Sequence, residues 1–200
     1  MNYNSLCTKN QIKEKKMKIG RILGLSLIAA SFVFAHTFKL ADTIKGAGPM
    51  VKEFNAECHY YEQFVNYITP DELKKWMDED KDFTIVDVRS VDEMKGGEID
   101  WPDYDEYPRG DVAIYAAMGG LKKDKVYVFV CATGHRAVLA GGELVKWFHF
   151  PKKNIYVLRG GINGWLNCGY PVVNKVTEFG GFKGLKKVGK VKEPVILDQF

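Results

Sequence analysis

The stretch Val126–Val130, with the sequence VYVFV, is apolar at nearly every position. Such a strand must be covered on both faces, as in a parallel sheet that lies between two layers of helices. Similar β-branched runs occur in FTIVDVRS (residues 83–90) and in IYVLRGG (residues 155–161), and helical patterns lie between the runs, most clearly at Ala137–Phe148. The sequence therefore predicts an α/β fold with a central, mainly parallel sheet and helices on both faces.

The length of the chain indicates one domain with extensions at both ends. Two hundred residues, 46% of them hydrophobic, are enough for a single substantial core. The first helix of the domain is predicted at TPDE, where Thr69 caps it, Pro70 suits its first position and Glu72 completes a Thr-x-x-Glu capping box. The predicted parts are a signal peptide at 1–35, an N-terminal extension at 36–66, the domain at 67–171 and a basic tail at 172–200.

Three stretches are expected to lack long regular elements. The N-terminal extension is predicted to be an irregular tether that ends by packing onto the domain. Residues 96–111, GGEIDWPDYDEYPRGD, are acidic, aromatic and rich in turn residues, which predicts a long surface loop near a pocket. The tail is rich in glycine and lysine without a helical register, which indicates a solvated tail or a short edge strand.

The first 35 residues have the pattern of a secretory leader. Their six basic side chains and one acidic side chain account for more than the whole net charge of +4. The rest of the chain is nearly neutral, which argues against nucleic acid as a partner. The apolar run Ile22–Phe34 is shorter than the roughly 20 residues of a membrane-spanning helix. Val33 and Ala35 match the small-residue pattern of a cleavage site after Ala35.

We therefore expect a mature protein that begins near His36 and resides in the periplasm or outside the cell, without stable membrane insertion. An uncleaved amphipathic anchor is the weaker alternative, because the apolar run has no polar face. Met17, directly before Lys18, is an alternative start of translation.

Export changes the expected state of the four cysteines. Cys7 would leave with the leader, and Cys58, Cys131 and Cys168 would remain in an oxidising compartment. If a disulfide forms among them, Cys58 with Cys168 is the expected pair. Three buried, reduced cysteines are the alternative, and the sequence leaves both open. Cys58 precedes His59, but two adjacent residues without spaced partners make poor tetrahedral ligands, so neither a metal site nor a cofactor is expected.

Cys131 lies where one buried strand ends and the following helix begins. This point is at the carboxyl edge of the predicted sheet, where open α/β folds place their ligand crevices. The free N–H groups of the helix N-terminus stabilise a thiolate or a bound anion there. Gly134 permits a tight backbone turn, and Arg136 adds a permanent cation. The pattern indicates a nucleophilic thiol beside an anion-binding loop, with a buried, inert cysteine as the alternative.

The segment CATGHR, residues 131–136, resembles the Cys-x-x-Gly-x-Arg active-site loop of the rhodanese family of sulfurtransferases. Further pieces agree in their order: TPDELKKW before the first core strand, IVDVRS with Asp87 and Arg89, then Glu93, and LRGGINGW near the end. The resemblance covers about Tyr67–Pro171 and implies a rhodanese-like fold.

The resemblance implies covalent catalysis through a cysteine persulfide. Cys131 would attack the outer sulfur of a small anionic donor such as thiosulfate and would pass that sulfur to a thiol or to cyanide, with ping-pong kinetics. The loop residues would cradle the persulfide and attract the donor: Ala132, Thr133, Gly134, His135 and Arg136. Four residues separate Cys131 from Arg136, whereas related cysteine phosphatases have five, so this tighter loop favours sulfur over phosphate.

Two departures from the family pattern leave the donor open. Ala132 stands where many members have a basic or amide residue, and Glu98 stands where a histidine is usual. Asp87 and Arg89 are expected to form a structural ion pair, and Trp165 is expected to pack the last helix onto the sheet.

Three functions are consistent with these features. The first is an exported thiosulfate sulfurtransferase-like enzyme, the second a persulfide carrier that hands sulfur to an acceptor protein, and the third a non-catalytic binding module with the same fold. The intact loop argues against the third.

Overall fold

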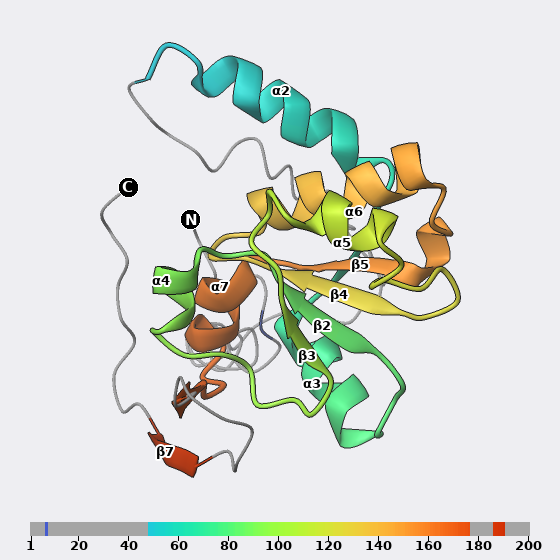
Figure 1. Ribbon diagram of the computed structural model, residues 1–200. Helices are drawn as coiled ribbons and strands as arrows, with labels where there is room; N and C mark the ends of the chain where they lie inside the picture. The colour runs from blue at the N-terminus through green and yellow to red at the C-terminus, as the bar shows by residue number, and fades with distance from the viewer. Residues whose placement is uncertain (1–6, 8–47, 177–185, 191–200) are drawn as a thin grey trace, which may run out of the picture.

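The computed structural model describes residue 7, residues 48–176 and residues 186–190 (Figure 1). The predicted signal peptide apart from Cys7, the first part of the N-terminal extension and much of the basic tail lie outside the described residues. Within the described ranges, no helix has the length and apolar character needed to cross a membrane.

The centre of the domain is a five-stranded sheet in which all neighbouring strands run parallel. Its order is β1-β5-β4-β2-β3, with β1 (Asn66–Ile68), β2 (Thr84–Asp87), β3 (Tyr104–Glu106), β4 (Tyr127–Val130) and β5 (Ile155–Leu158). Every residue of β2 and β4 is buried, because helices cover both faces of the sheet. The predicted sheet is confirmed, and the three apolar runs of the sequence form its inner strands.

The helices lie in two layers (Figure 1). One layer contains α2 (Val51–Glu62), α5 (Val112–Ala117) and α6 (His135–Phe148), and the other contains α3 (Pro70–Asp78) and α7 (Gly161–Asn167). The short α4 (Val91–Met94) follows β2 along the chain, and the 3₁₀ helix η3 (Lys152–Asn154) leads into β5. Phe129 packs in the apolar cluster on the α6 side, whereas Val128 and Val130 pack in the cluster on the α3 and α7 side. Alternate side chains of the inner strands therefore contribute to two apolar cores, one on each face of the sheet.

The sequence signals for two helices are confirmed. Thr69 Oγ1 accepts a hydrogen bond from Glu72 N at 3.2 Å, and Glu72 Oε2 accepts one from Thr69 N at 2.8 Å, so the capping box starts α3. Helix α6 covers the predicted stretch and begins two residues earlier, at His135.

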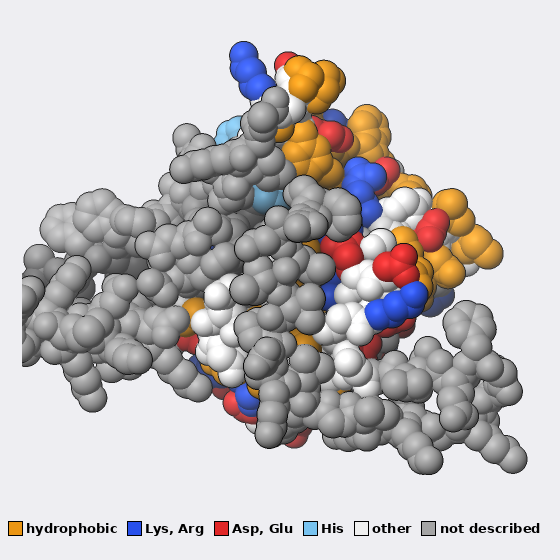
Figure 2. Space-filling model, turned by 90° about the vertical axis from the view of Figure 1, so that its left-hand side faces the viewer, with side chains coloured by type: hydrophobic (Ala, Val, Ile, Leu, Met, Phe, Trp, Pro, Cys, Tyr) orange, Lys and Arg blue, Asp and Glu red, His pale blue; other side chains and the backbone are white. Residues whose placement is uncertain are grey.

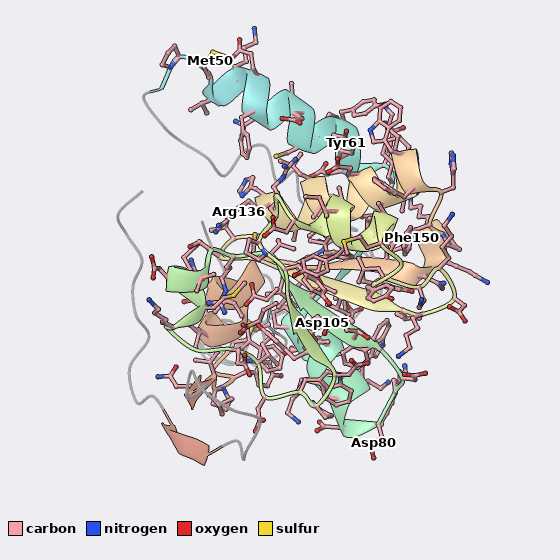
Figure 3. All side chains as sticks on the ribbon, viewed as in Figure 1. Met50, Tyr61, Asp80, Asp105, Arg136 and Phe150 are labelled. Atoms are coloured by element: carbon pink, nitrogen blue, oxygen red, sulfur yellow. A yellow bond between two sulfur atoms is a disulfide. The ribbon has the colours of Figure 1, made fainter. Side chains whose placement is uncertain are left out.

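The prediction of an irregular N-terminal extension is wrong for α2. Phe54, Cys58, Tyr61 and Val65 recur at helical spacing, and α2 packs along α6. The close approach is possible because residue 142 is glycine: a Cβ atom there would lie 2.7 Å from the Tyr61 ring. Figure 3 shows Tyr61 at the end of α2 that lies nearest to α6.

The prediction of a surface loop at residues 96–111 is wrong for Glu98 and for β3, whereas the rest of this segment contains neither helix nor strand. Strand β3 pairs with β2, and Glu98 forms an antiparallel bridge with Val173. The Trp101 ring stacks on Phe83 with centroids 4.5 Å apart and donates its Nε1 hydrogen to the Phe83 carbonyl at 2.9 Å. Aromatic packing therefore anchors this segment to the sheet.

The described part of the basic tail contains a small antiparallel sheet of β6 (Val173–Val176) and β7 (Lys186–Lys190). The bridge from β6 to Glu98 ties it to the domain. In its described residues, 172–176 and 186–190, the tail thus supplies strands to a second sheet and no edge strand to the central one.

The expected disulfide between Cys58 and Cys168 is wrong. Cys168 is bonded to Cys7, with Cα atoms 5.5 Å apart, and Cys58 is free and buried. Cys58 belongs to α2 in the layer of α6, whereas Cys168 directly follows α7 in the opposite layer. The central sheet therefore separates Cys58 from Cys168.

Candidate active site

The structure places Cys131 directly after β4, at the carboxyl edge of the sheet. The Cys131 side chain is 1% exposed, and its Sγ accepts a hydrogen bond from Gly134 N at 3.0 Å. Gly134 has a φ of 108°, a backbone conformation that glycine adopts readily, and it caps the 14-residue helix α6. A backbone N–H group and the positive end of a helix dipole thus face the sulfur atom.

The N-terminus of α7 supports the same loop from the other side. Ile162 N donates to the Cys131 carbonyl at 2.9 Å, and Asn163 N donates to the Ala132 carbonyl at 3.1 Å. A Cβ atom at Gly161 would overlap the Cys131 carbonyl oxygen, so only glycine permits this approach. Trp165, in the next turn of α7, is 2% exposed and packs in the core below the sheet. The RGG segment, residues 159–161, together with the N-terminus of α7, therefore shapes the cysteine loop. Sequence reasoning missed this role.

Arg136 and Glu93 form a bidentate ion pair at the rim of the loop. Arg136 Nη1 and Nη2 each donate to one Glu93 oxygen at 2.6 Å. The Arg136 guanidinium lowers the pKa of Glu93 to about 2, against the opposing effect of burial and with help from hydrogen bonds to Ser90. Glu93 raises the pKa of Arg136 in return, and the Cys131 thiolate adds to that rise. Arg136 is thus held beside Cys131 with its charge shared by Glu93.

The view onto this edge shows acidic and basic side chains of the described residues side by side (Figure 2). Arg136 lies at the start of α6 (Figure 3).

Thr133 and His135 stabilise the loop internally. Thr133 Oγ1 lies 2.9 Å from His135 Nδ1, and the His135 side chain is 4% exposed. The His135 ring also packs against Phe54 of α2, with centroids 6.0 Å apart. Ala132, Thr133 and Arg136 are the partly exposed residues of the loop.

Asp87 and Arg89 form a buried ion pair behind the loop. Arg89 Nη2 donates to Asp87 Oδ2 at 2.6 Å and to the Gly97 carbonyl at 2.7 Å, and Arg89 Nη1 donates to the Glu93 carbonyl at 3.2 Å. Tyr104 donates its hydroxyl hydrogen to Asp87 Oδ2 at 2.7 Å. Burial, and then the Asp87 carboxylate, raises the pKa of Tyr104 well above its usual range. This network fixes α4, and with it Glu93, relative to β2.

Arg109 is a further cation at this edge, and sequence reasoning missed it. Its backbone N donates to the Val88 carbonyl at 3.3 Å, and Val88 N donates to the carbonyl of Val130, the residue before Cys131. Arg109 Nε is buried and has no hydrogen-bond partner among the described residues. Only one signal in the sequence points to Arg109: it is the single basic residue in an otherwise acidic segment.

Cys58 lies in the same neighbourhood. It is fully buried, and burial is the main reason why its pKa is raised to about 12. Smaller electrostatic effects come from nearby groups, among them Cys131 and Arg109. The Cys58 thiol is therefore a neutral group near Cys131.

Among the residues that the structure describes, no three His, Cys, Asp or Glu side chains are placed to hold a metal ion. The arrangement can hold a thiolate, stabilise a persulfide and attract an anion.

The comparisons agree on one family. The model of the rhodanese-like domain matches residues 69–168, half of the chain. The polysulfide-sulfur transferase homodimer from Wolinella succinogenes is 30% identical, with 66% of this chain and 95% of that chain covered and a TM-score of 0.52. A protein of unknown function from Rhodopseudomonas palustris, described as a possible tyrosine phosphatase, is 22% identical, with 60% and 92% covered and a TM-score of 0.51; this likeness shows the fold alone. No curated protein matches the sequence significantly.

Glu93→Gln tests the ion pair with Arg136. Glutamine keeps an oxygen that can accept the hydrogen bond from Ser90 N but carries no charge. At pH 7 we expect the free energy of unfolding to fall by about 1 kcal/mol, as for a partly exposed pair. The pKa of Glu93 in the folded protein is about 2, below the ordinary value of 4.5, so the charge contributes stability above pH 4.5. That contribution is lost as the pH falls toward 2.

Urea unfolding of both proteins between pH 7 and pH 2 measures this difference. Asp92→Asn, which removes the carboxylate of the exposed Asp92–Lys95 pair, is the matched control and should change stability little. A difference between wild type and E93Q that stays constant over the whole pH range would contradict the role given to the charge.

Proposed function

We propose, since the chain belongs to the rhodanese-like domain family, that it is a sulfurtransferase that carries sulfane sulfur as a persulfide on Cys131. The observation that carries the proposal is the hydrogen bond from Gly134 N to Cys131 Sγ at 3.0 Å, at the N-terminus of α6. An N–H donor and a helix dipole aimed at this sulfur stabilise negative charge there, both as thiolate and as persulfide.

The reaction proceeds in two displacements. The Cys131 thiolate attacks the outer sulfur of the donor, a new S–S bond forms, and the electron pair of the broken bond leaves with the shortened donor. The acceptor, a thiolate or cyanide, then attacks the outer sulfur of the persulfide. The sulfur leaves with the acceptor, and the electron pair returns to Cys131 as thiolate. No cofactor or external oxidant is needed for either step.

We propose polysulfide as the favoured donor class, with thiosulfate as the alternative. The support is the polysulfide-sulfur transferase from Wolinella succinogenes, which is 30% identical to this chain. Both donors are anions. Because the Glu93 carboxylate offsets the charge of Arg136, Arg109 is the better candidate to attract them.

A persulfide carrier is the second candidate function. The 1% exposure of Cys131 favours it, because a sheltered persulfide is protected from adventitious thiols until a partner protein docks. Phosphatase activity, the possible function of the Rhodopseudomonas palustris protein, is disfavoured for this chain by the four-residue gap between Cys131 and Arg136.

Export through the leader at residues 1–35 stays part of the proposal. Removal of that leader would take Cys7 away and leave Cys168 as a free thiol. The mature form would then contain three unpaired cysteines, of which Cys131 alone adjoins the helix N-terminus described above.

A mass-spectrometric experiment tests the persulfide. Purified protein is incubated with polysulfide, freed of excess donor and weighed intact; we expect an adduct of about 32 Da, one sulfur atom, that peptide mapping assigns to Cys131. Cyanide should remove the adduct as thiocyanate. Cys131→Ser should show neither adduct nor thiocyanate, whereas Cys168→Ser, in the opposite layer, should retain both. Slow turnover with a stable adduct favours the carrier.

Two results would reject the assignment. One is the absence of an adduct on the wild-type protein with polysulfide and with thiosulfate. The other is undiminished thiocyanate formation by C131S. Hydrolysis of an aryl phosphate by the wild type, abolished in C131S, would support phosphatase activity in its place.

Arg109→Gln tests the donor-binding cation. Loss of a charge-assisted contact should lower kcat/KM for an anionic donor by about 10- to 100-fold, mainly through KM. The control is Lys153→Gln, which removes an exposed cation at the opposite, amino edge of the sheet. Steady-state rates at several donor concentrations measure the effect, and equal KM values for R109Q and wild type would refute this role.

N-terminal analysis of the exported protein tests the leader. We expect a first residue at or near His36, and alkylation of Cys168 in urea without reductant, because its partner Cys7 has gone. The oxidised full-length chain, purified without processing, is the control and should require reductant before Cys168 reacts. An exported protein that retains Cys7 would overturn the cleavage site.

A further inference from the structure

Helix α2 faces the cysteine loop with a stripe of side chains at helical spacing. Phe54, Cys58 and Tyr61 lie on the side of α2 that is directed toward α6. The half-buried Phe54 ring packs on His135, which in turn lies 2.9 Å from Thr133 Oγ1 of the loop. One side chain of α2 therefore reaches the residues that surround Cys131.

The next turn of α2 contributes a buried thiol. Cys58 is fully buried, and its burial keeps the thiol protonated far above neutral pH. Cys131 is close enough to influence the charge of Cys58. The side of the loop that faces α2 thus includes the Phe54 ring and the Cys58 thiol, whereas the side that faces α4 offers the Arg136–Glu93 pair.

We propose that α2 forms one wall of the donor site and that Phe54 determines donor specificity by presenting apolar surface to a sulfur chain bound at Cys131. The site would then prefer a chain of zerovalent sulfur atoms, as in polysulfide, to the hydrated oxyanion of thiosulfate. This inference rests on the proposed sulfurtransferase function and names the substrate class of the same site.

The preference follows from the chemistry of the two donors. The inner atoms of a polysulfide chain are polarisable and weakly hydrated, and divalent sulfur makes favourable contacts with aromatic rings. Thiosulfate has three oxygen atoms that need hydrogen-bond donors, and burying them against a phenyl ring would leave them unpaired. Two of the five N–H donors of Arg136 already bind Glu93, whose carboxylate also offsets the positive charge that would attract those oxygens.

A second attachment of α2 to α6 lies two turns away from Phe54, which allows a matched control. Tyr61 packs on Gly142, and Lys146 Nζ lies 4.1 Å from the centroid of Tyr60 and 4.6 Å from that of Trp147. These contacts hold the C-terminal half of α2 and touch no residue of the cysteine loop. A change at Tyr61 loosens the helix without altering the surface at Phe54.

The test compares wild type, F54A, F54L, F54Q and Y61A with polysulfide and with thiosulfate, using cyanide as the acceptor and thiocyanate as the product. We expect F54A to lose about tenfold in kcat/KM for polysulfide, the scale of a lost apolar contact, and to lose much less for thiosulfate. F54L, which stays apolar, should recover most of the loss. F54Q should move the preference toward thiosulfate, since its amide can donate to the oxygens. Y61A should affect both donors equally.

Each outcome decides a different point. Equal losses for both donors in F54A and F54Q, matching those of Y61A, would show that Phe54 only anchors α2 and would overturn the inference. If F54A fails to fold by circular dichroism, the ratio of the two donors measured with F54L and F54Q decides the question. Persulfide formation on wild-type Cys131 is scored separately by mass, so failure of the sulfurtransferase proposal is distinguishable from failure of the role of Phe54.

Discussion

The buried ion pair between Asp87 and Arg89 is the contact on which the geometry of the site depends. Arg89 is 2% exposed, and a charge removed from water needs a nearly complete set of partners. Its guanidinium finds them in Asp87 and in the carbonyls of Glu93 and Gly97. These bonds join the end of β2 to α4, and α4 presents Glu93 to Arg136. The orientation of the loop arginine is therefore set by a network that begins in the core.

The sulfur site itself is built mainly from backbone groups. Gly134 N approaches the Cys131 sulfur, and the first N–H groups of α7 hold the carbonyls of Cys131 and Ala132. A backbone cradle does not depend on the side chain at position 132, so the absence of a basic residue there leaves the proposed chemistry intact. Donor selection then depends on side chains from other segments, and Arg109 and Phe54 are the two that we infer.

Both of these residues lie outside the motifs that the sequence displays. The predicted sheet, the capping box at Thr69 and the place of Cys131 followed from short-range patterns of apolar and capping residues. Helix α2 was missed for two reasons. The face of α2 that packs on the domain contains a cysteine, and its neighbours in the sequence are charged. The packing of α2 on α6 also requires the small residue Gly142, which lies 81 residues beyond Tyr61 in the chain. Strand β3 has only three residues, and its pairing with β2 is decided by the packing of Trp101 on Phe83.

The sequence by itself determined the fold class and the position of Cys131 in the fold. Apolar runs must be buried on both faces, and a cysteine that ends such a run before a helix must lie at the carboxyl edge of the sheet. Only the tertiary structure decided which distant side chains meet that thiol and which cysteines pair. Those contacts depend on which helix layer each residue belongs to. Cys58 lies on one side of the sheet with Cys131 nearby, and Cys168 lies on the other side with Cys7. Distances across a sheet are set by packing, which local residue patterns do not encode.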